Sequence, residues 1–425
     1  LISILLMKTI SIITFFIFSL ILTIHLNFFS IKDKIYKKYP NLNIRQYIFK
    51  KEPVFNKLNN DYNVKFLPET ELIKLQLNKK KIKFKKNYYN NNLKDNSIAY
   101  KKWGSFFIDL YENNLFITDY LGNFYLSKNI DNLTTDDVSL QTININSNLK
   151  NNLRVFDTLI SGGNIYITYT YKENECKKIY LSYAKINFSQ LKFINLFESA
   201  KCNPQASPGR IQLYKTKEKE GLLLSISSGG YNKPSKASQD KNLIDGKIIL
   251  ISLADKNFSI FSLGHRVIQG LFVDKELVLA TEHGPRGGDE INLIKEKNNY
   301  GWPIASYGEK YNFDYELNPF YKKSHKQFGF TEPIYSYIPA IGISELTRLP
   351  NDFSNFFENV FIITSLYGRS IFLTKFSDNF ERIIFLEKIF LNERIRDIKY
   401  FAKSKYILLA FEENGELGLL TKKTK

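Results

Sequence analysis

ENVFIITSLYGRSIFLTKF, residues 358–376, holds two short runs of β-branched and aromatic residues separated by a turn at Gly368. Apolar residues alternate along each run, as expected for a half-buried strand, and Gly and Asn interrupt the pattern between runs. The segment therefore predicts an antiparallel β-hairpin.

The same strand–turn–strand pattern occurs five more times, while no long amphipathic helix is found. The other copies lie at residues 113–128, 162–183, 221–254, 275–296 and 405–422. A repeated hairpin is the building unit of a propeller blade, so the six copies predict a six-bladed β-propeller, an all-β fold. Because the copies are unevenly spaced, a β-sandwich is the alternative. In a propeller the long insertions gather on one face, where a site is expected.

Composition supports a folded chain. Of the 425 residues, 44% are hydrophobic and 24% are charged, which excludes a disordered, collagen-like or coiled-coil protein. The net charge of +18 is spread over a chain rich in Lys, Asn and Ile throughout, as an AT-biased coding sequence produces. We therefore predict no nucleic-acid partner.

The N-terminus contains an apolar segment. Residues 10–29 carry no formally charged side chain and are long enough to cross a membrane as one helix. Met7 and Lys8 precede this segment, and no small-residue cleavage motif follows it, so an uncleaved anchor is favoured over a cleaved signal. We expect a membrane anchor or uncleaved signal over residues 1–30, a polar stalk over 31–60 and the propeller over 61–425. The lysines after the segment outnumber Lys8 and favour a cytoplasmic propeller.

The stretch TEHGPRGGDEINLIKEKNNYGWP, residues 281–303, is the most distinctive part of the chain. Its glycines and Pro285 force an irregular loop whose backbone carbonyls can turn outward. Asp289 and Glu290 add hard oxygen ligands beside that loop, a combination that suits Ca²⁺. The alternative is a long turn whose acids are solvated.

This stretch resembles the signature loop of the quinoprotein glucose/sorbosone dehydrogenases, aldose dehydrogenases with a six-bladed propeller that use pyrroloquinoline quinone (PQQ) and Ca²⁺. Other segments resemble family motifs in the same order: SQDKNLIDGKIILI at 238–251, SLGHRVIQGL at 262–271, EPIYSYIPAIGISEL at 332–346 and ERIRDI at 393–398. The resemblance covers roughly residues 200 to 420. It implies a sugar as substrate, a propeller facing the periplasm or cell exterior, and by default a monomer.

The resemblance also implies a set of site residues. It implies that the cofactor is bound by Arg266, His283, Arg394 and Arg396. Guanidinium groups match the carboxylates of PQQ, and His283 stands where some members carry a cofactor-contacting Gln. It implies that Ca²⁺ is held by the carbonyls of Gly284 and Pro285, with Asp289 and Glu290 supporting the loop or a second Ca²⁺. We expect Trp302 to be a packing anchor between blades.

Two family residues are absent. The family's catalytic histidine, a general base, aligns with Gln205, Ala206 and Ser207, and Val267 stands where the family usually has a cofactor-contacting Asn. The remaining candidates for the base are His265, His283 or a nearby carboxylate.

Three readings follow from these losses. One is a divergent dehydrogenase that oxidises the anomeric carbon of a sugar by hydride transfer to the quinone. Another is a propeller that binds a sugar or glycan without redox chemistry. The third is a structural or interaction propeller on a membrane anchor.

The chain contains two cysteines, Cys176 and Cys202. They lie in neighbouring predicted elements beside the loop that lacks the histidine. In an oxidising compartment we expect them to form a disulfide that clamps this loop, and the alternative is a pair of buried free thiols.

Overall fold

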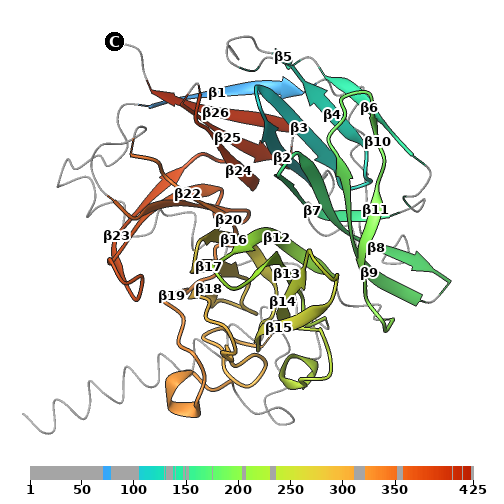
Figure 1. Cartoon of the computed structure of the whole chain (residues 1–425). Helices are drawn as coiled ribbons and strands as arrows, with labels where there is room; N and C mark the ends of the chain where they lie inside the picture. The colour runs from blue at the N-terminus through green and yellow to red at the C-terminus, as the bar shows by residue number, and fades with distance from the viewer. Residues whose placement is uncertain are drawn as a thin grey trace, which may run out of the picture. The chain divides into compact units, whose positions relative to one another are not determined.

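Six β-sheets, the blades, surround a central channel (Figure 1). The computed structural model describes residues 70–77, 105–128, 130, 137–138, 140–146, 149, 153–174, 176–202, 207–229, 236–310, 321–351, 358–403, 405–413 and 415–422. All of them belong to one unit of the chain, residues 64–88 and 102–425.

The first three blades follow the chain order, innermost strand first. Blade 1 contains β2 (Phe106–Tyr111), β3 (Asn114–Asp119), β4 (Phe124–Ser127), β6 (Gln141–Ile145) and β10 (Gln190–Leu191). Blade 2 contains β7 (Arg154–Ser161), β8 (Asn164–Glu173), β9 (Cys176–Lys185) and β11 (Ile194–Glu198). Blade 3 contains β12 (Pro208–Lys215), β13 (Glu220–Ile226), β14 (Lys247–Ser252) and β15 (Phe258–Leu263).

The last three blades are also given with the innermost strand first, and the two outer strands of blade 6 come from earlier in the chain. Blade 4 contains β16 (Ile268–Asp274), β17 (Leu277–Glu282), β18 (Asp289–Leu293) and β19 (Tyr335–Tyr337). Blade 5 contains β20 (Ile343–Arg348), β21 (Val360–Ser365), β22 (Ser370–Phe376) and β23 (Ile383–Phe390). Blade 6 contains β24 (Ile395–Phe401), β25 (Tyr406–Phe411), β26 (Glu416–Lys422), β1 (Thr70–Leu77) and β5 (Asp137–Val138).

The ring is closed in two ways. Each innermost strand contacts the innermost strands of both neighbouring blades, and β24 of blade 6 contacts β2 of blade 1. In addition, β1 pairs antiparallel with β26, so that a strand from the N-terminal part of the chain completes the last blade. These contacts confirm the predicted six-bladed propeller and exclude the β-sandwich.

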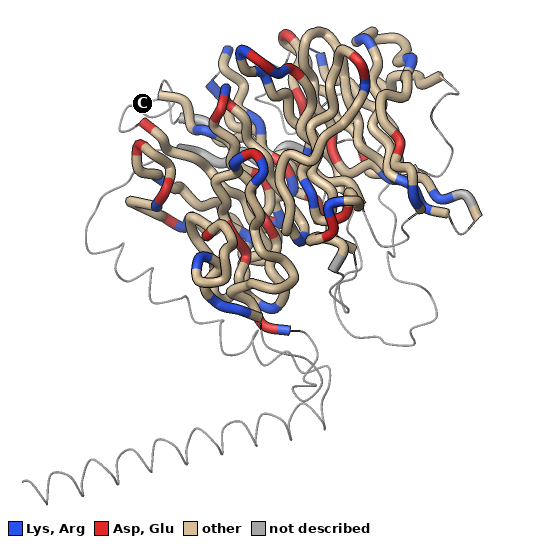
Figure 2. The backbone as a smooth tube through the Cα atoms, turned by 60° about the horizontal axis from the view of Figure 1, so that its bottom comes forward, with Lys and Arg blue, Asp and Glu red and all other residues tan. Residues whose placement is uncertain are grey.

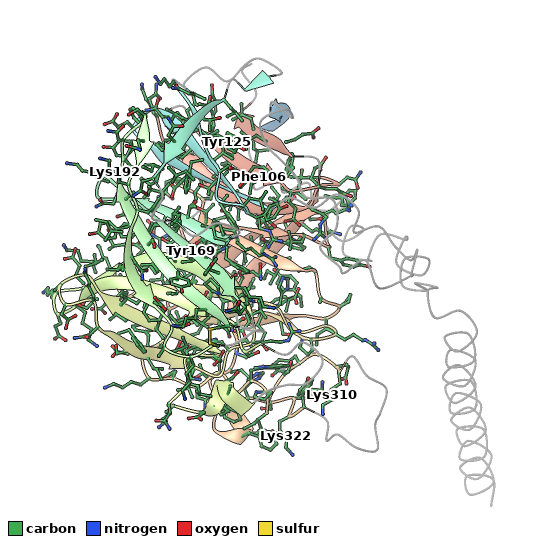
Figure 3. The ribbon with its side chains drawn as sticks, turned by 90° about the vertical axis from the view of Figure 1, so that its right-hand side faces the viewer. Phe106, Tyr125, Tyr169, Lys192, Lys310 and Lys322 are labelled. Carbon is green, nitrogen blue, oxygen red and sulfur yellow. A yellow bond between two sulfur atoms is a disulfide. The ribbon has the colours of Figure 1, made fainter. Side chains whose placement is uncertain are left out.

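Hydrophobic residues fill all six interfaces between neighbouring blades. Between blades 2 and 3, for example, Leu181 packs in one cluster with Leu224 and Ile249, and all three are fully buried. Figure 3 shows Phe106, Tyr125 and Tyr169 among the sheets, whereas Lys192 and Lys322 reach the surface. Acidic and basic residues of the described part are intermingled along the tube in the view of Figure 2.

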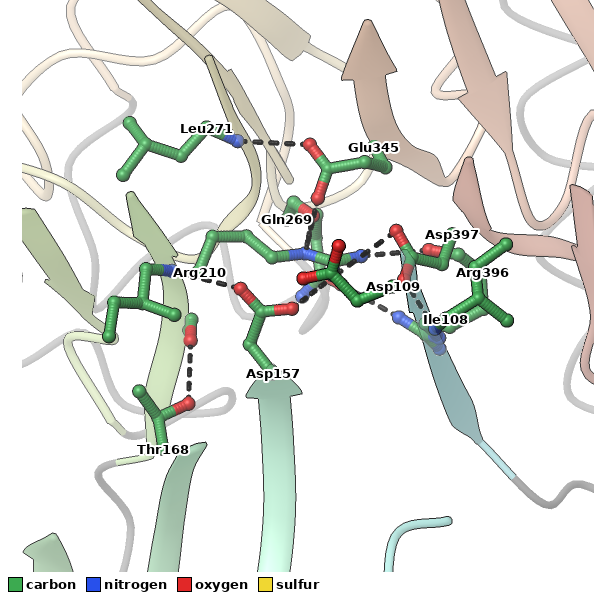
Figure 4. A network of polar contacts seen from close by, with 12 residues as sticks. Ile108, Asp109, Asp157, Thr168, Arg210, Gln269, Leu271, Glu345, Arg396 and Asp397 are labelled. Atoms are coloured by element: carbon green, nitrogen blue, oxygen red, sulfur yellow. Dashed lines mark hydrogen bonds and ion pairs between the residues drawn. The ribbon is translucent and has the colours of Figure 1, made fainter. Parts of the chain in front are cut away.

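The six hairpins predicted from the sequence are the second and third strands of the blades. They correspond to β3–β4, β8–β9, β13–β14, β17–β18, β21–β22 and β25–β26. The alternating apolar pattern did not predict the innermost strands, because charged residues interrupt it there. Four of these residues are Asp157, Arg210, Glu345 and Asp397, which face the channel (Figure 4).

The channel residues join one blade to the next. Arg210 pairs with Asp157 at 2.8 Å and with Glu345 at 2.9 Å. The carboxylates also accept backbone N–H groups of neighbouring blades, as Asp397 does from Ile108 at 3.0 Å (Figure 4). Five innermost strands, β7, β12, β16, β20 and β24, carry a register shift at this level, and such bulges re-aim side chains.

The structure joins Cys176 and Cys202 in a disulfide with a Cα–Cα distance of 5.0 Å, which confirms the predicted pair. The bond ties the start of β9 in blade 2 to the loop that leads into β12 of blade 3. The predicted anchor and stalk, residues 1–30 and 31–60, lie outside the described residues. Within the part that the structure describes, no helix is long and apolar enough to span a membrane.

Candidate functional site

The residues implied by the resemblance come together on one face of the ring. Because successive strands of a blade are antiparallel, the start of each innermost strand and the loop after each second strand lie on the same face. Arg266 precedes β16, and Arg394 and Arg396 lie at the start of β24. His283 follows β17, so it lies on this face as well.

A small cavity opens on this face within blade 4. Its volume is about 10 Å³, room for about one water molecule or one small ion. The residues that matter for its chemistry are Arg266, Glu282, His283, Gly284, Glu290 and His325. Four of the residues implied by the resemblance therefore line one cavity, although they are up to 24 positions apart in the sequence.

Several contacts hold Arg266 in place. Its guanidinium donates from Nη1 to the backbone oxygen of His283 at 3.0 Å. The same group lies over the ring of Trp302, 5.3 Å from the centroid. Its backbone N–H donates to the carboxylate of Glu282. Trp302 itself donates from Nε1 to Ser228 at 3.1 Å, so the predicted packing anchor also supports a site arginine.

Asp289 supports the loop that carries His283 and Gly284. Its Oδ1 accepts the N–H of Gly284 at 3.0 Å and lies 3.6 Å from Nδ1 of His283, while Oδ2 accepts the N–H groups of Ile341 and Ile343. Burial by itself would raise the pKa of Asp289, but the contact with His283 and these backbone donors outweigh it and lower the pKa. Both oxygens are therefore engaged within the protein, which favours loop support over metal binding.

Glu290 lies deeper in the cavity. Its oxygens are 3.7 Å from Nε2 of His325 and 3.3 Å from Nδ2 of Asn292. Burial and the nearby charge of Glu282 raise the pKa of Glu290 well above its usual value. Burial lowers the pKa of His325. Among the described residues, Nδ1 of His325 and Oδ1 of Asn292 are buried atoms without a hydrogen-bond partner.

A metal at this position would need backbone ligands as well as side chains. Within the described ranges, no group of three His, Cys, Asp or Glu side chains is close enough together to hold a metal ion. Ca²⁺ commonly combines carboxylate and backbone carbonyl oxygens. Glu290, which has a carboxylate, and Gly284, which has a backbone carbonyl, both line the cavity, whereas Pro285 is not among its lining residues.

The two histidines considered as a base have different surroundings. His265 is fully buried, and its ring nitrogens lie 2.8 Å from Ser262 and 3.0 Å from Glu282. Its ring also stacks on Tyr300 at 4.7 Å. The side chain of His283, in contrast, is 22% exposed. This geometry assigns His265 a supporting position and leaves His283 with access to a ligand.

Arg394 and Arg396 share one buried carboxylate, Glu412. Arg394 donates to Glu412 Oε1 from Nε at 3.1 Å and from Nη2 at 3.0 Å, and Arg396 donates to Oε2 from Nε at 2.7 Å. Burial alone would raise the pKa of Glu412, but the two guanidiniums outweigh it and lower the pKa. Arg396 also donates to Gln269 at 2.8 Å. Gln269 belongs to β16, so it connects this pair to the strand that follows Arg266.

Sequence reasoning missed Glu412. The residue lies in the turn after β25 and matches no quoted motif, so only the fold shows that it faces both arginines. Of the residues at the position of the absent base, Gln205 and Ala206 lie outside the described part. Ser207 forms a hydrogen bond with Ser227 at 3.1 Å. Val267 is buried, and its carbonyl accepts the N–H of His283 at 2.9 Å.

The fold and these contacts define a six-bladed propeller that carries three arginines and a small cavity on one face. The sequence profile of the Glucose / Sorbosone dehydrogenase family matches residues 154–419. The chain belongs to this family.

Individual proteins show the same relationship. An uncharacterized protein of Synechocystis sp. is 33% identical over 221 residues, which cover 47% of this chain and 52% of that protein. An aldose sugar dehydrogenase of Escherichia coli is 25% identical over 205 residues, 44% of this chain and 54% of that protein. The matched segments thus span about half the length of these relatives.

Solved structures share the fold. The PQQ-bound form of an aldose sugar dehydrogenase from Streptomyces coelicolor superposes with a TM-score of 0.55 at 17% identity. The superposition covers 75% of this chain and 93% of that structure. At this identity the likeness supports the propeller fold alone.

Proposed function

We propose that the chain is a divergent PQQ- and Ca²⁺-dependent aldose dehydrogenase that oxidises the anomeric carbon of a sugar. The observation that carries the proposal is that Arg266, Arg394 and Arg396 lie on one face of the ring, with Arg266 bonded to the loop of His283 and Gly284. Family membership supplies the class of reaction, and this geometry supplies the means to bind its cofactor.

PQQ carries three negatively charged carboxylates, and three positively charged arginines would match them. Arg394 and Arg396 both donate to the carboxylate of Glu412, which holds the two guanidinium groups together. Arg266 donates to a backbone oxygen and lies over the ring of Trp302. Planar guanidiniums bind carboxylates with two parallel hydrogen bonds, which favours PQQ over a neutral ligand.

The cavity fits a cation. Burial and the nearby charge of Glu282 raise the pKa of Glu290, as expected where two carboxyls share a site. A divalent ion would supply a counter-charge, with Glu290 and the carbonyls of Gly284 and Pro285 as its ligands. His325 and Asn292 face Glu290 with Nε2 and Nδ2, and their other polar atoms, Nδ1 and Oδ1, are buried without a hydrogen-bond partner among the described residues, which leaves room for a water or another ligand.

When bound, PQQ supplies a quinone that accepts the hydride from the anomeric C–H bond, and a base on the protein takes the hydroxyl proton. The protein's own groups bind and orient the reactants. The three arginines would hold the cofactor carboxylates, and Asp289 holds the loop of His283 in place. His283 is the better placed of the two histidines considered as the base, because its ring is accessible and that of His265 is not.

The test is turnover by the full chain reconstituted with PQQ and Ca²⁺. We expect a panel of aldoses to reduce an artificial electron acceptor, and Arg266→Gln to lower activity at limiting PQQ. The chain without PQQ is the control. A reconstituted chain that binds PQQ but oxidises no aldose would contradict the proposal.

A second candidate is a propeller that binds a sugar or glycan without redox chemistry. It is favoured by the loop before β12, where Ser207 pairs with Ser227 and the family's histidine is missing from the sequence. Under this alternative, sugars bind in calorimetry and bound PQQ stays oxidised.

We also propose that the propeller lies outside the cytoplasm, on a membrane anchor. The Cys176–Cys202 disulfide supports the location, because disulfides persist in oxidising compartments.

A further inference from the structure

Lys247 is a fully buried cation in the third blade. It is the first residue of β14, and none of its side chain is exposed. Its ammonium group donates to the backbone oxygens of Ala237 at 2.9 Å, Ser238 at 3.0 Å and Asp245 at 2.8 Å. An ammonium has three donors, so three backbone carbonyls satisfy it completely.

These carbonyls belong to the loop between β13 and β14, which contains the 3₁₀ turn η2 (Lys236–Gln239). Burial lowers the pKa of Lys247 to about 8, because the charged ammonium group loses its contact with water. A buried charge held in this way constrains the loop, because removing it takes a charge-assisted hydrogen bond from each of the three carbonyls.

The same loop is bonded directly to the segment that carries Arg266. Gly264 donates its N–H to Ser238 at 3.1 Å, and the hydroxyl of Ser238 donates to the carbonyl of His265 at 3.2 Å. His265 in turn donates its N–H to Gly246 at 3.0 Å. Gly246 has a φ of +67°, and a Cβ there would lie 2.2 Å from the Ser238 hydroxyl, so the approach requires glycine.

The turn also supports the ring beneath Arg266. Gln239 donates from Nε2 to the backbone oxygen of Trp302 at 2.6 Å and to Asn299 at 3.1 Å. The guanidinium of Arg266 lies over the ring of Trp302. The peptide that precedes Arg266 and the residue whose ring lies beneath its guanidinium are therefore both tied to the turn that Lys247 organises.

We propose that Lys247 is a positioning residue that, through the 236–246 loop, sets the placement of Arg266 for binding a cofactor carboxylate. The inference rests on the proposed function, since it assigns Lys247 a part in the quinone site. Lys247 would not touch the cofactor itself, and its effect would be transmitted by Ser238 and Gln239.

The first test compares Lys247→Met with Lys241→Met, which removes an exposed lysine of the same loop. The measurement is the dissociation constant of PQQ in the presence of Ca²⁺, by equilibrium dialysis of the full chain. We expect Lys247→Met to weaken PQQ binding by about tenfold, as loss of one charge-assisted contact typically does, and Lys241→Met to leave it unchanged. Unchanged affinity in a folded Lys247→Met protein would overturn the inference.

A double-mutant cycle separates positioning from a general loss of structure. If Lys247 acts through Arg266, Lys247→Met should weaken PQQ binding little further when Arg266→Gln is already present. Fully additive losses would contradict the link. Independently of the quinone, the amides of Gly264 and His265 should exchange hydrogen faster in Lys247→Met than in Lys241→Met.

Ser238→Ala covers the case in which Lys247→Met does not fold. It removes only the hydroxyl bond to His265 and should weaken PQQ binding by about threefold. Unchanged binding in this variant would overturn the proposed link. If the wild-type chain binds no PQQ, the proposed function fails, and the role of Lys247 in that site fails with it. Wild-type binding together with unaffected variants would overturn the inference about Lys247 alone.

Discussion

Replacing Glu412 by Gln removes the one negative charge that Arg394 and Arg396 share. Glu412 is fully buried, and three guanidinium N–H groups donate to it at 2.7 to 3.1 Å. Removing one partner of a buried ion pair generally costs about 3–5 kcal/mol, because a charge is left uncompensated. Glutamine keeps the shape and one oxygen acceptor, so we expect the free energy of unfolding to fall by about 3 kcal/mol.

The assay is urea unfolding of the Glu412→Gln and wild-type proteins with and without PQQ. We expect PQQ to stabilise the variant more than the wild type, because its carboxylates replace the lost negative charge beside the two guanidiniums. Glu413→Gln is the matched control, since Glu413 pairs with Arg369 at 2.6 Å with side chains 30% and 33% exposed. A partly exposed pair of this kind contributes at most about 1 kcal/mol.

Two results would refute this reasoning. A loss of less than about 1 kcal/mol in Glu412→Gln would show that Glu412 does not hold the two guanidiniums as the structure indicates. Equal stabilisation of variant and wild type by PQQ would show that this pair is not part of the quinone site.

Three further predictions test the fold. Burial raises the pKa of Asp109 from 3.8 to about 6, so the folded protein keeps a proton that the unfolded chain loses between these values, and stability should decline by about 2–3 kcal/mol as pH rises through this window. In Asp109→Asn this part of the decline should vanish from pH-dependent urea unfolding, and an unaltered pH profile would contradict the assignment. The Cys176–Cys202 bond closes a loop with a sequence separation of 26, so Cys176→Ser should lower thermal stability by about 3 kcal/mol, and an unchanged melting temperature would argue against it. Leu224→Ala should cost about 2–5 kcal/mol in chemical denaturation, because Leu224 is fully buried between blades 2 and 3, and a loss below about 1 kcal/mol would be inconsistent with that packing.

The blade hairpins could be predicted from the sequence because their strands are apolar and separated by clear turns. The innermost strands could not, since residues such as Asp157 and Glu345 interrupt the apolar pattern. These carboxylates are stable inside the propeller because Arg210 and the backbone N–H groups of neighbouring blades satisfy them. Such partners come from other blades and leave no local signal in the sequence.

Sequence motifs indicated only some of the residues at the candidate site. Arg266, His283 and Gly284, which the motifs singled out, line one cavity, and the disulfide was expected from the compartment argument. The different exposure of His265 and His283 depends on packing against Ser262, Glu282 and other residues, which no motif encodes. The contacts of Glu412 with the two arginines, and those of the 236–246 loop with the segment before Arg266, form only when the chain folds.

Anaerobic addition of an aldose to the full chain loaded with PQQ and Ca²⁺ tests the central claim most directly. The measured quantity is the absorbance spectrum of the bound quinone in a single turnover. The account predicts conversion of the oxidised quinone to its reduced form, with a rate that depends on the sugar. A quinone that stays oxidised with every aldose, although PQQ is bound, would contradict the claim that this propeller is a dehydrogenase.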